Sequence, residues 1–116
     1  MNRVLLVGRV EGDPRFRITA SGKRRLWFRL CCRSEHYDEA GRSREHTTWL
    51  NVVCWGGRAE GLRHALPEGQ WVAVEGRISS WKREGEAKAR WETEIVASEI
   101  TRLEREPTGA GGAAAA

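Results

Sequence analysis

The stretch TTWLNVVCWGGRAEGLRHAL, residues 47–66, contains the transition that decides the fold. Residues 47–55 are rich in β-branched and aromatic side chains, a composition that predicts a strand. The pair Gly56-Gly57 ends this strand. Over residues 58–66 the apolar side chains then recur at helical spacing, which predicts a short helix. The other predicted elements are arranged around this junction of a strand and a helix.

Outward from this junction, the chain shows further short apolar runs separated by glycine and proline. The strands predicted from these runs are 4–10, with a continuation over 15–19, then 24–33, 71–81 with a bend at Gly76, and 90–101. Five strands with one short helix between the third and the fourth is the order expected of an OB-fold, a Greek-key barrel. The sequence therefore predicts an all-β, five-stranded OB-fold barrel, although strands of this length also suit other small barrels.

The composition predicts one domain followed by a tail. Hydrophobic residues make up 40% and charged residues 31% of the 116 residues, which is typical of a globular domain. Residues 107–116 contain only Pro, Thr, Gly and Ala, which carry no charge and no large apolar group. We therefore expect an OB-fold domain over residues 1–106 and a disordered Gly/Ala-rich tail over residues 107–116.

Charge and cysteine content limit the classes of partner. Nine of the 20 cations lie in residues 1–33 beside only two acids, so this segment has a net charge of +7 within a total of +4. Such a concentration of basic residues predicts an anionic partner. No apolar run approaches the ~20 residues of a membrane helix, and no secretory signal is visible. The three cysteines lack disulfide or zinc-ligand spacing, so we expect a cytoplasmic protein with reduced cysteines and no metal or cofactor.

Strand 24–33 separates into two faces because side chains alternate along a strand. One face is apolar and predicted to lie in the core: Leu26, Phe28, Leu30 and Cys32. The other face alternates cations with an aromatic ring and is predicted to face solvent: Arg25, Trp27, Arg29 and Arg33.

The third and fourth strands divide in the same way. Core positions are predicted at Leu50, Val52, Cys54, Val72, Val74 and Ile78. The opposite faces carry Trp49, Asn51, Val53 and Trp55 on the third strand and Arg77, Ser79, Trp81 and Arg83 on the fourth. Trp71 and Trp91 are expected to be structural, since tryptophan is usually well buried.

Tryptophans interleaved with arginines suit single-stranded nucleic acid. A base that stacks on an aromatic ring contributes about 1–3 kcal/mol whatever its identity, and cations neutralise the phosphates. The residues predicted to contact nucleic acid are Arg25, Trp27, Arg29, Arg33, Tyr37, Trp49, Asn51, Trp55, Arg77 and Trp81. DNA and RNA both offer bases and phosphates, so this pattern does not choose between them.

Several motifs resemble those of bacterial single-stranded DNA-binding proteins. In chain order they are Asn2-Arg3-Val4-Leu5-Leu6-Val7-Gly8, Asp13-Pro14, Phe28-Arg29-Leu30, Thr48-Trp49-Leu50-Asn51-Val52-Val53-Cys54-Trp55-Gly56, Val72-Ala73-Val74-Glu75-Gly76-Arg77 and Trp91-Glu92-Thr93-Glu94-Ile95-Val96-Ala97. The match covers about residues 2–101 in order.

The resemblance implies an OB-fold that assembles as a homotetramer, or as a dimer, and that serves replication, recombination and repair without catalysis. It implies stacking by Trp49, Trp55 and Tyr37, with Trp81 in a region where the family often has another aromatic residue. It also implies a location with the nucleoid. The chain departs from the family because it lacks an acidic, hydrophobic C-terminal tip, so we expect no recruitment of partners through the tail.

Two other readings remain open. A compact OB-fold protein without the acidic tip also resembles primosomal replication-restart proteins, which are typically dimers. An RNA-binding OB module, or one that binds only proteins, is a second alternative. Catalysis is not expected, because His36, His46 and His64 are scattered and no nucleophile or carboxylate constellation accompanies them.

Overall fold

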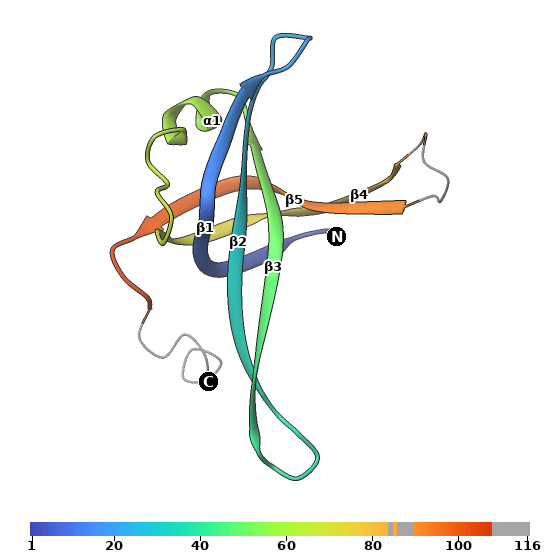
Figure 1. Ribbon diagram of the computed structural model, residues 1–116, viewed down its shortest axis with the longest axis vertical. Helices are drawn as coiled ribbons and strands as arrows, with labels where there is room; N and C mark the ends of the chain where they lie inside the picture. Colours follow the sequence, from blue (N-terminus) through green and yellow to red (C-terminus); the bar gives the residue numbers. More distant parts are fainter. Residues whose placement is uncertain (84, 86–89, 108–116) are drawn as a thin grey trace.

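The computed structural model describes residues 1–83, 85 and 90–107 (Figure 1). Its elements are β1 (Val4–Ile18), β2 (Arg24–Tyr37), β3 (Ser43–Trp55), α1 (Gly57–Leu62), β4 (Trp71–Arg83) and β5 (Arg90–Leu103). The strands form a closed barrel in the order β1-β2-β3-β5-β4. The predicted fold class, a five-stranded barrel with one short helix between the third and fourth strands, is confirmed.

The barrel closes through one parallel contact between strands that are distant in sequence. β3 and β5 pair in parallel through Val52 with Ile95 and Val53 with Val96. The remaining pairings, of β1 with β2 and β4, of β2 with β3, and of β4 with β5, are antiparallel. The chain between β3 and β4, which includes α1, makes the crossover that brings β4 and β5 back to the sheet.

The core consists of the inward-facing residues that alternation predicts. Phe28 is the largest fully buried side chain, and the fully buried Leu26 and Leu30 lie on the same face of β2. Val52 and Cys54 from β3 pack in the same cluster. The segment after β3 contributes further buried side chains to this cluster: Ala59 from α1 and Leu66 beyond it. The helix is shorter than the predicted 58–66, because Ala65 and Leu66 follow its end.

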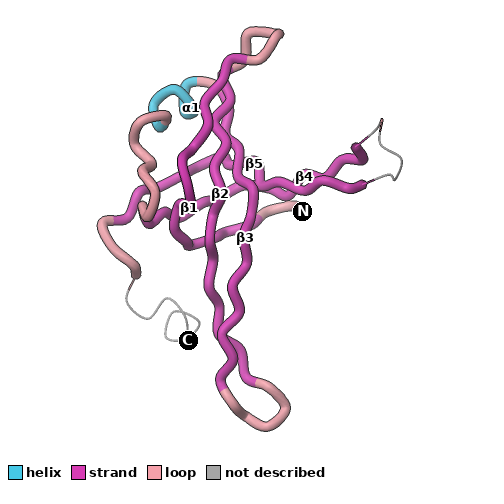
Figure 2. The backbone as a smooth tube through the Cα atoms, in the orientation of Figure 1, coloured by secondary structure: helices cyan, strands magenta, loops and turns pink. Residues whose placement is uncertain are grey.

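The hairpin of β2 and β3 and the hairpin of β4 and β5 both extend beyond the barrel (Figures 1 and 2). The polar segment expected as a loop around 35–44 is instead mostly strand, since cross-strand pairing continues to Tyr37 and Ser43. Asp38 closes the tip, where its Oδ1 accepts hydrogen bonds from the backbone N–H of Arg42 at 2.9 Å and of Ala40 at 3.0 Å. The bond from the Arg42 backbone, followed by that from the Arg44 side chain, lowers the pKa of Asp38.

Ile78 and Trp91 are exposed, which corrects the expectation that both are buried. Ile78 pairs with Ile95, and Trp91 pairs with Lys82, in the part of the β4–β5 hairpin that projects from the barrel. Their side chains continue the inward-facing row of the sheet past the point where a core is available to cover them. Trp91 is 70% exposed as a result.

Two expectations concern the ends and the environment of the chain. The predicted tail lies outside the described residues from residue 108 onward. Over the described part of the chain, no helix has the length and apolar character needed to cross a membrane.

Candidate nucleic-acid interface

The predicted contact residues lie on one continuous surface because paired residues of neighbouring strands point to the same side of a sheet. We call this surface the outer face. It includes Arg9, Glu11, Arg15 and Arg17 of β1; Arg25, Trp27, Arg29, Cys31, Arg33 and Tyr37 of β2; Glu45, Trp49, Asn51, Val53 and Trp55 of β3; Glu92, Glu94 and Val96 of β5; and Arg77 and Trp81 of β4. The structure therefore brings all ten predicted site residues to the same side of the sheet.

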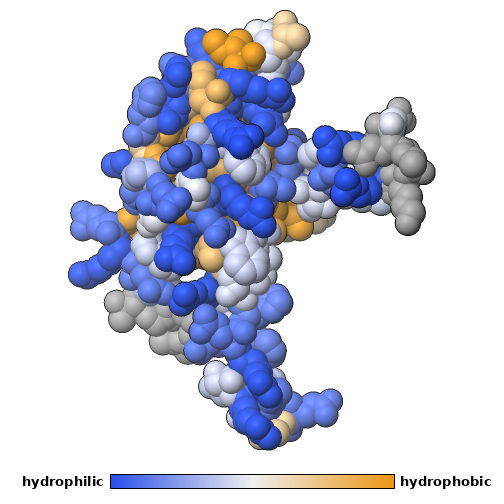
Figure 3. All heavy atoms as spheres, viewed as in Figure 1, coloured by the Kyte–Doolittle hydropathy of each residue, from blue (hydrophilic) through white to orange (hydrophobic). Residues whose placement is uncertain are grey.

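Rings and cations alternate along the β2–β3 part of the outer face. Trp55 lies opposite Arg25, and Trp49 lies between the row of Arg29 and the row of Arg33. The view of Figure 3 has β1, β2 and β3 toward the reader, and the surface over these strands is mostly hydrophilic. A surface of this kind offers planar groups for stacking beside groups for phosphate contact.

The tryptophans of the outer face differ in how much of the ring they present. Trp49 is 48% exposed and Trp55 is 39% exposed, whereas Trp27 is partly buried. The guanidinium carbon of Arg15 lies 5.7 Å from the centre of the Trp27 ring. Trp49 and Trp55 are therefore the more accessible platforms of β2 and β3, and the exposed Tyr37 stands near the tip of the hairpin.

Between the rings, the outer face has two buried side chains, Val53 and Cys31. Val53 is predicted to share the solvent face with the tryptophans, and it does lie on that side of β3, but it is fully buried. Its neighbours on adjacent strands are Trp27 on β2 and Val96 on β5. Cys31 is also buried, opposite Trp49.

The arginines of the outer face have carboxylate neighbours. Nη2 of Arg25 lies 3.5 Å from Oε2 of Glu94, in a pair whose side chains are only 21% and 14% exposed. The same guanidinium lies 5.8 Å from the centre of the Trp55 ring. Arg25 thus links β5 to the ring on β3, and the pair holds it in place more firmly than an exposed arginine.

Two further arginines form more exposed pairs. Nε of Arg29 lies 3.9 Å from Oε2 of Glu11, and Nε of Arg33 lies 3.4 Å from Oε1 of Glu45. At this exposure an ion pair contributes only about 0–1 kcal/mol. Both arginines can therefore exchange a carboxylate for a phosphate at small cost.

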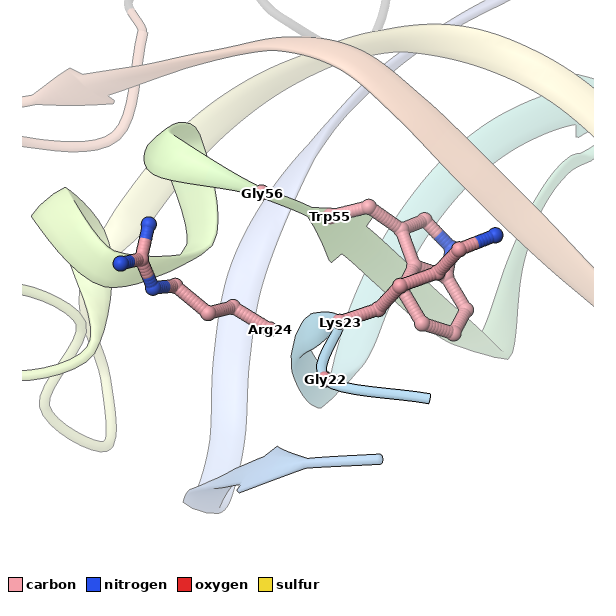
Figure 4. Close-up of a pocket in the computed structure, with 5 residues that line it drawn as sticks. All are labelled: Gly22, Lys23, Arg24, Trp55 and Gly56. Atoms are coloured by element: carbon pink, nitrogen blue, oxygen red, sulfur yellow. The ribbon is translucent and has the colours of Figure 1, made fainter. Parts of the chain in front are cut away.

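A pocket lies at the end of β3, beside Trp55 (Figure 4). It has a volume of about 610 Å³ and is lined by Gly22, Lys23, Arg24, Trp55 and Gly56. The Arg24 side chain points toward α1, where its Nε lies 3.8 Å from Oε2 of Glu60. Lys23 extends on the Trp55 side and places a cation at this end of the outer face.

The described residues form no cluster of three or more metal-ligating side chains. Burial, with a smaller contribution from Cys31, raises the pKa of the Cys32 thiol to about 11. Burial also raises the pKa of the Cys54 thiol. Both thiols are protonated at neutral pH and are therefore poor nucleophiles and poor metal ligands.

Sequence alternation missed several contributors to this surface, among them Arg15, Lys23 and Glu11. Arg15 was not identified because the register between β1 and β2 shifts between Glu11 and Arg15, so its position opposite Trp27 does not follow from counting residues. Lys23 lies in a turn, where no strand pattern applies. Glu11 was treated only as a charge, and nothing in the sequence indicates that it pairs with Arg29 on the neighbouring strand.

With this geometry established, comparison with known proteins identifies the family. The model of the single-strand binding protein family matches residues 1–103. Single-stranded DNA-binding protein 1 of Chlorobaculum tepidum is 33% identical over 113 residues, which cover 96% of this chain and 70% of that protein. Single-stranded DNA-binding protein 3 of Listeria innocua is 34% identical over 113 residues, covering 97% of this chain and 69% of the relative.

Solved structures agree with these sequence matches. The wild-type single-stranded DNA binding protein from Thermus aquaticus has a TM-score of 0.81 and 30% identity, covering 91% of this chain. This chain spans about half of that protein, since the match covers 52% of it. A Plasmodium falciparum SSB complex with ssDNA shares the fold, with a TM-score of 0.82 at 23% identity, covering 90% of this chain and 96% of that one. Because the family model covers the whole barrel and its relatives match nearly the entire chain, the protein belongs to the single-strand binding protein family.

Proposed function

We propose that this protein binds single-stranded DNA largely without regard to sequence and thereby serves replication, recombination and repair. The observation that carries the proposal is the exposure of Trp49 and Trp55 among arginines on one face of a barrel whose family binds single strands. Stacking on these rings is open to every base, and the arginines supply the phosphate contacts. The role is binding rather than catalysis, in keeping with the family.

The spacing of the rings favours an extended strand over a duplex. Trp49 and Trp55 are six residues apart on β3, which corresponds to about 20 Å at 3.3–3.4 Å per residue. A strand that stacks on both rings must therefore run along β3 for several nucleotides. A duplex exposes phosphates but keeps its bases paired, so it gains only the electrostatic part of the interaction.

The direct test is tryptophan fluorescence during titration with an oligo-dT strand, with the matched duplex and the matched RNA strand in parallel, at two salt concentrations. We expect strong quenching by the DNA strand, weaker binding at the higher salt, and little response to the duplex. A folded protein that shows no quenching would contradict the proposal. Stronger binding of the RNA strand would favour the RNA-binding alternative.

Removal of two cations from the outer face should weaken the salt dependence of binding. Arg33 and Arg77 are both exposed on this face. For the double variant Arg33→Ala/Arg77→Ala we expect the slope of log K against log salt to fall by about 1.4, since each phosphate contact on a single strand contributes about 0.7. Titrations at several salt concentrations measure this slope.

Arg58→Ala/Arg105→Ala is the matched control, because it removes the same charge from positions outside the outer face. An equal fall in slope for the control would mean that net charge, and not the outer face, sets the salt dependence.

We further propose that the protein is a homo-oligomer, a tetramer or alternatively a dimer, and that the outward side of β1 contributes to the assembly. Leu5 is 75% exposed there, and the exposed Val7 lies on the same side of the strand. Neighbouring exposed apolar side chains of this kind mark contact surfaces. This side of β1 pairs with Ala73 and Glu75 of β4, away from the Trp49 rows.

Leu5→Glu should reduce the oligomer to smaller species, because it places a charge in an apolar contact. Native mass spectrometry or sedimentation velocity measures the change, and circular dichroism verifies the fold. Ile18→Glu, at the far end of the same strand and also exposed, should leave the mass unchanged. The reverse result, with Ile18→Glu disruptive and Leu5→Glu neutral, would place the interface elsewhere.

Because the proposed function would be performed on DNA, we also propose that the protein lies in the bacterial cytoplasm, in association with the nucleoid. The curated relatives named above are bacterial, which supports this placement. Fluorescence microscopy of a tagged protein together with a DNA stain tests it, and exclusion of the signal from the stained DNA would contradict it.

A further inference from the structure

One part of the outer face places a carboxylate, a group that serves neither stacking nor phosphate contact, beside one of the arginines. Glu11 of β1, Arg29 of β2 and Trp49 of β3 together line a pocket of about 380 Å³. The pocket thus combines an exposed ring, a cation and a carboxylate, drawn from three adjacent strands.

The two charged groups are close but remain available to a ligand. At 3.9 Å, the distance from Nε of Arg29 to Oε2 of Glu11 is longer than a hydrogen bond. Their side chains are 52% and 50% exposed, and neither forms a hydrogen bond with another described residue. A strong donor and a strong acceptor therefore stand side by side at the edge of the Trp49 ring with their hydrogen-bonding capacity unused.

The order of these groups across the sheet determines which atoms on the edge of a stacked base face Arg29 and which face Glu11. Neighbouring strands lie about 4.8 Å apart, so Arg29 is one strand from Trp49 and Glu11 is two strands away. For a base that stacks on Trp49 with its sugar on the side away from β1, the ring nitrogen at position 3 of a pyrimidine faces Arg29. The group at position 4 then faces Glu11.

Cytosine matches this order at both positions. Its N3 accepts a hydrogen bond, which the Arg29 guanidinium donates, and its N4 amino group donates to the carboxylate of Glu11, as Glu and Asp do when they read cytosine in DNA. Uracil and thymine reverse both groups, because their N3 carries a hydrogen and their O4 is an acceptor. In the same pose they set donor against donor at Arg29 and acceptor against acceptor at Glu11.

We propose that the pocket formed by Glu11, Arg29 and Trp49 reads the edge of one base and favours cytosine over uracil or thymine. This inference rests on the proposed binding of single-stranded DNA and adds a base bias to it. Stacking on the other rings remains tolerant of sequence, so the bias is confined to the nucleotide held at this pocket.

The test compares oligo-dC with oligo-dU of equal length, because these bases differ at positions 3 and 4 but not in the methyl group that distinguishes thymine. Fluorescence titrations give the ratio of the two affinities for the wild-type protein and for Glu11→Gln. The amide of glutamine can both donate and accept, so it no longer discriminates between an amino group and a carbonyl. We expect Glu11→Gln to lower the dC-to-dU affinity ratio by about three- to tenfold, consistent with the loss of one charged hydrogen bond that is partly exposed to solvent.

Glu45→Gln is the matched control. Glu45 is also paired with an arginine of the outer face at similar exposure, but it does not line the pocket with Trp49. The change in charge is identical, so the control should keep the wild-type ratio even if both variants bind every oligonucleotide more tightly. An unchanged ratio in Glu11→Gln, or an equal fall in Glu45→Gln, would overturn the base-reading proposal while leaving single-strand binding intact. Failure of the wild-type protein to bind either oligonucleotide would instead overturn the proposed function.

Discussion

Replacement of Trp49 or Trp55 by alanine should weaken binding of an oligo-dT strand by about 1–3 kcal/mol each, the usual contribution of one stacked base. The two rings stand in different rows of the outer face and have different neighbours, Cys31 for Trp49 and Arg25 for Trp55. Their losses should therefore add, because distant sites without shared partners are approximately independent. Fluorescence anisotropy with a labelled strand measures the affinity without relying on the tryptophan signal.

Neither substitution should unfold the protein, since both rings are well exposed and lie outside the core cluster. Trp91→Ala is the matched control, because Trp91 is more exposed than either ring but lies on the inward-facing row of the β4–β5 hairpin. We expect this control to bind as the wild type does. Unchanged affinity in both Trp49→Ala and Trp55→Ala, with the fold preserved, would rule out stacking on the outer face.

Gly76→Ala should lower the free energy of unfolding by roughly 3 kcal/mol, at the upper end of the cost of overpacking. Gly76 lies where the register between β4 and β5 shifts and the strand leaves the barrel. A Cβ atom there would stand 2.2 Å from the carbonyl oxygen of Val96 and 2.9 Å from Cα of Ala97. These are backbone atoms of a paired strand, so the clash cannot be relieved by rotation of a side chain.

Gly61→Ala provides the comparison for this substitution. Nothing lies within 4 Å of a Cβ atom at Gly61 in α1, and alanine is preferred to glycine in a helix by about 1 kcal/mol. Urea unfolding followed by circular dichroism, at one protein concentration, should show Gly76→Ala less stable and Gly61→Ala equal to or slightly more stable than the wild type. Equal midpoints for Gly76→Ala and the wild type would show that β4 can shift away from β5 at low cost.

The local pattern of residues was sufficient to predict the order of the strands and the helix, and to predict which side of each strand in the barrel faces the core. Alternation places Phe28 in the core and Trp49 on the solvent side because the side-chain period of a strand is two, whatever the strand pairs with. The end of the third strand at Gly56-Gly57 and the helix after it are likewise predicted from patterns that span only a few residues. For the same reason, the motifs of the family could be recognised without any knowledge of contacts.

The β2–β3 hairpin and the exposure of Trp91 required the tertiary structure. Residues 34–37 have no apolar alternation, and they form a strand because residues 43–46 stand opposite them across the hairpin. Trp91 is a large aromatic residue at an inward-facing position of its strand. It is nevertheless exposed, because the hairpin continues past the end of the barrel. Burial depends on what other strands bring to a position, and this information is absent from the strand itself.

The sequence by itself determined the five strands, the helix, the two faces and the family of this protein. Only the tertiary structure decided that Arg25 reaches Glu94, that Arg15 covers Trp27, and that Glu11 meets Arg29 beside Trp49. Each of these contacts joins residues from different strands, and each depends on the register of their pairing, which a shift such as the one between Glu11 and Arg15 changes by two residues. Side-chain alternation is a local property of the chain, whereas register is set by the closure of the whole barrel.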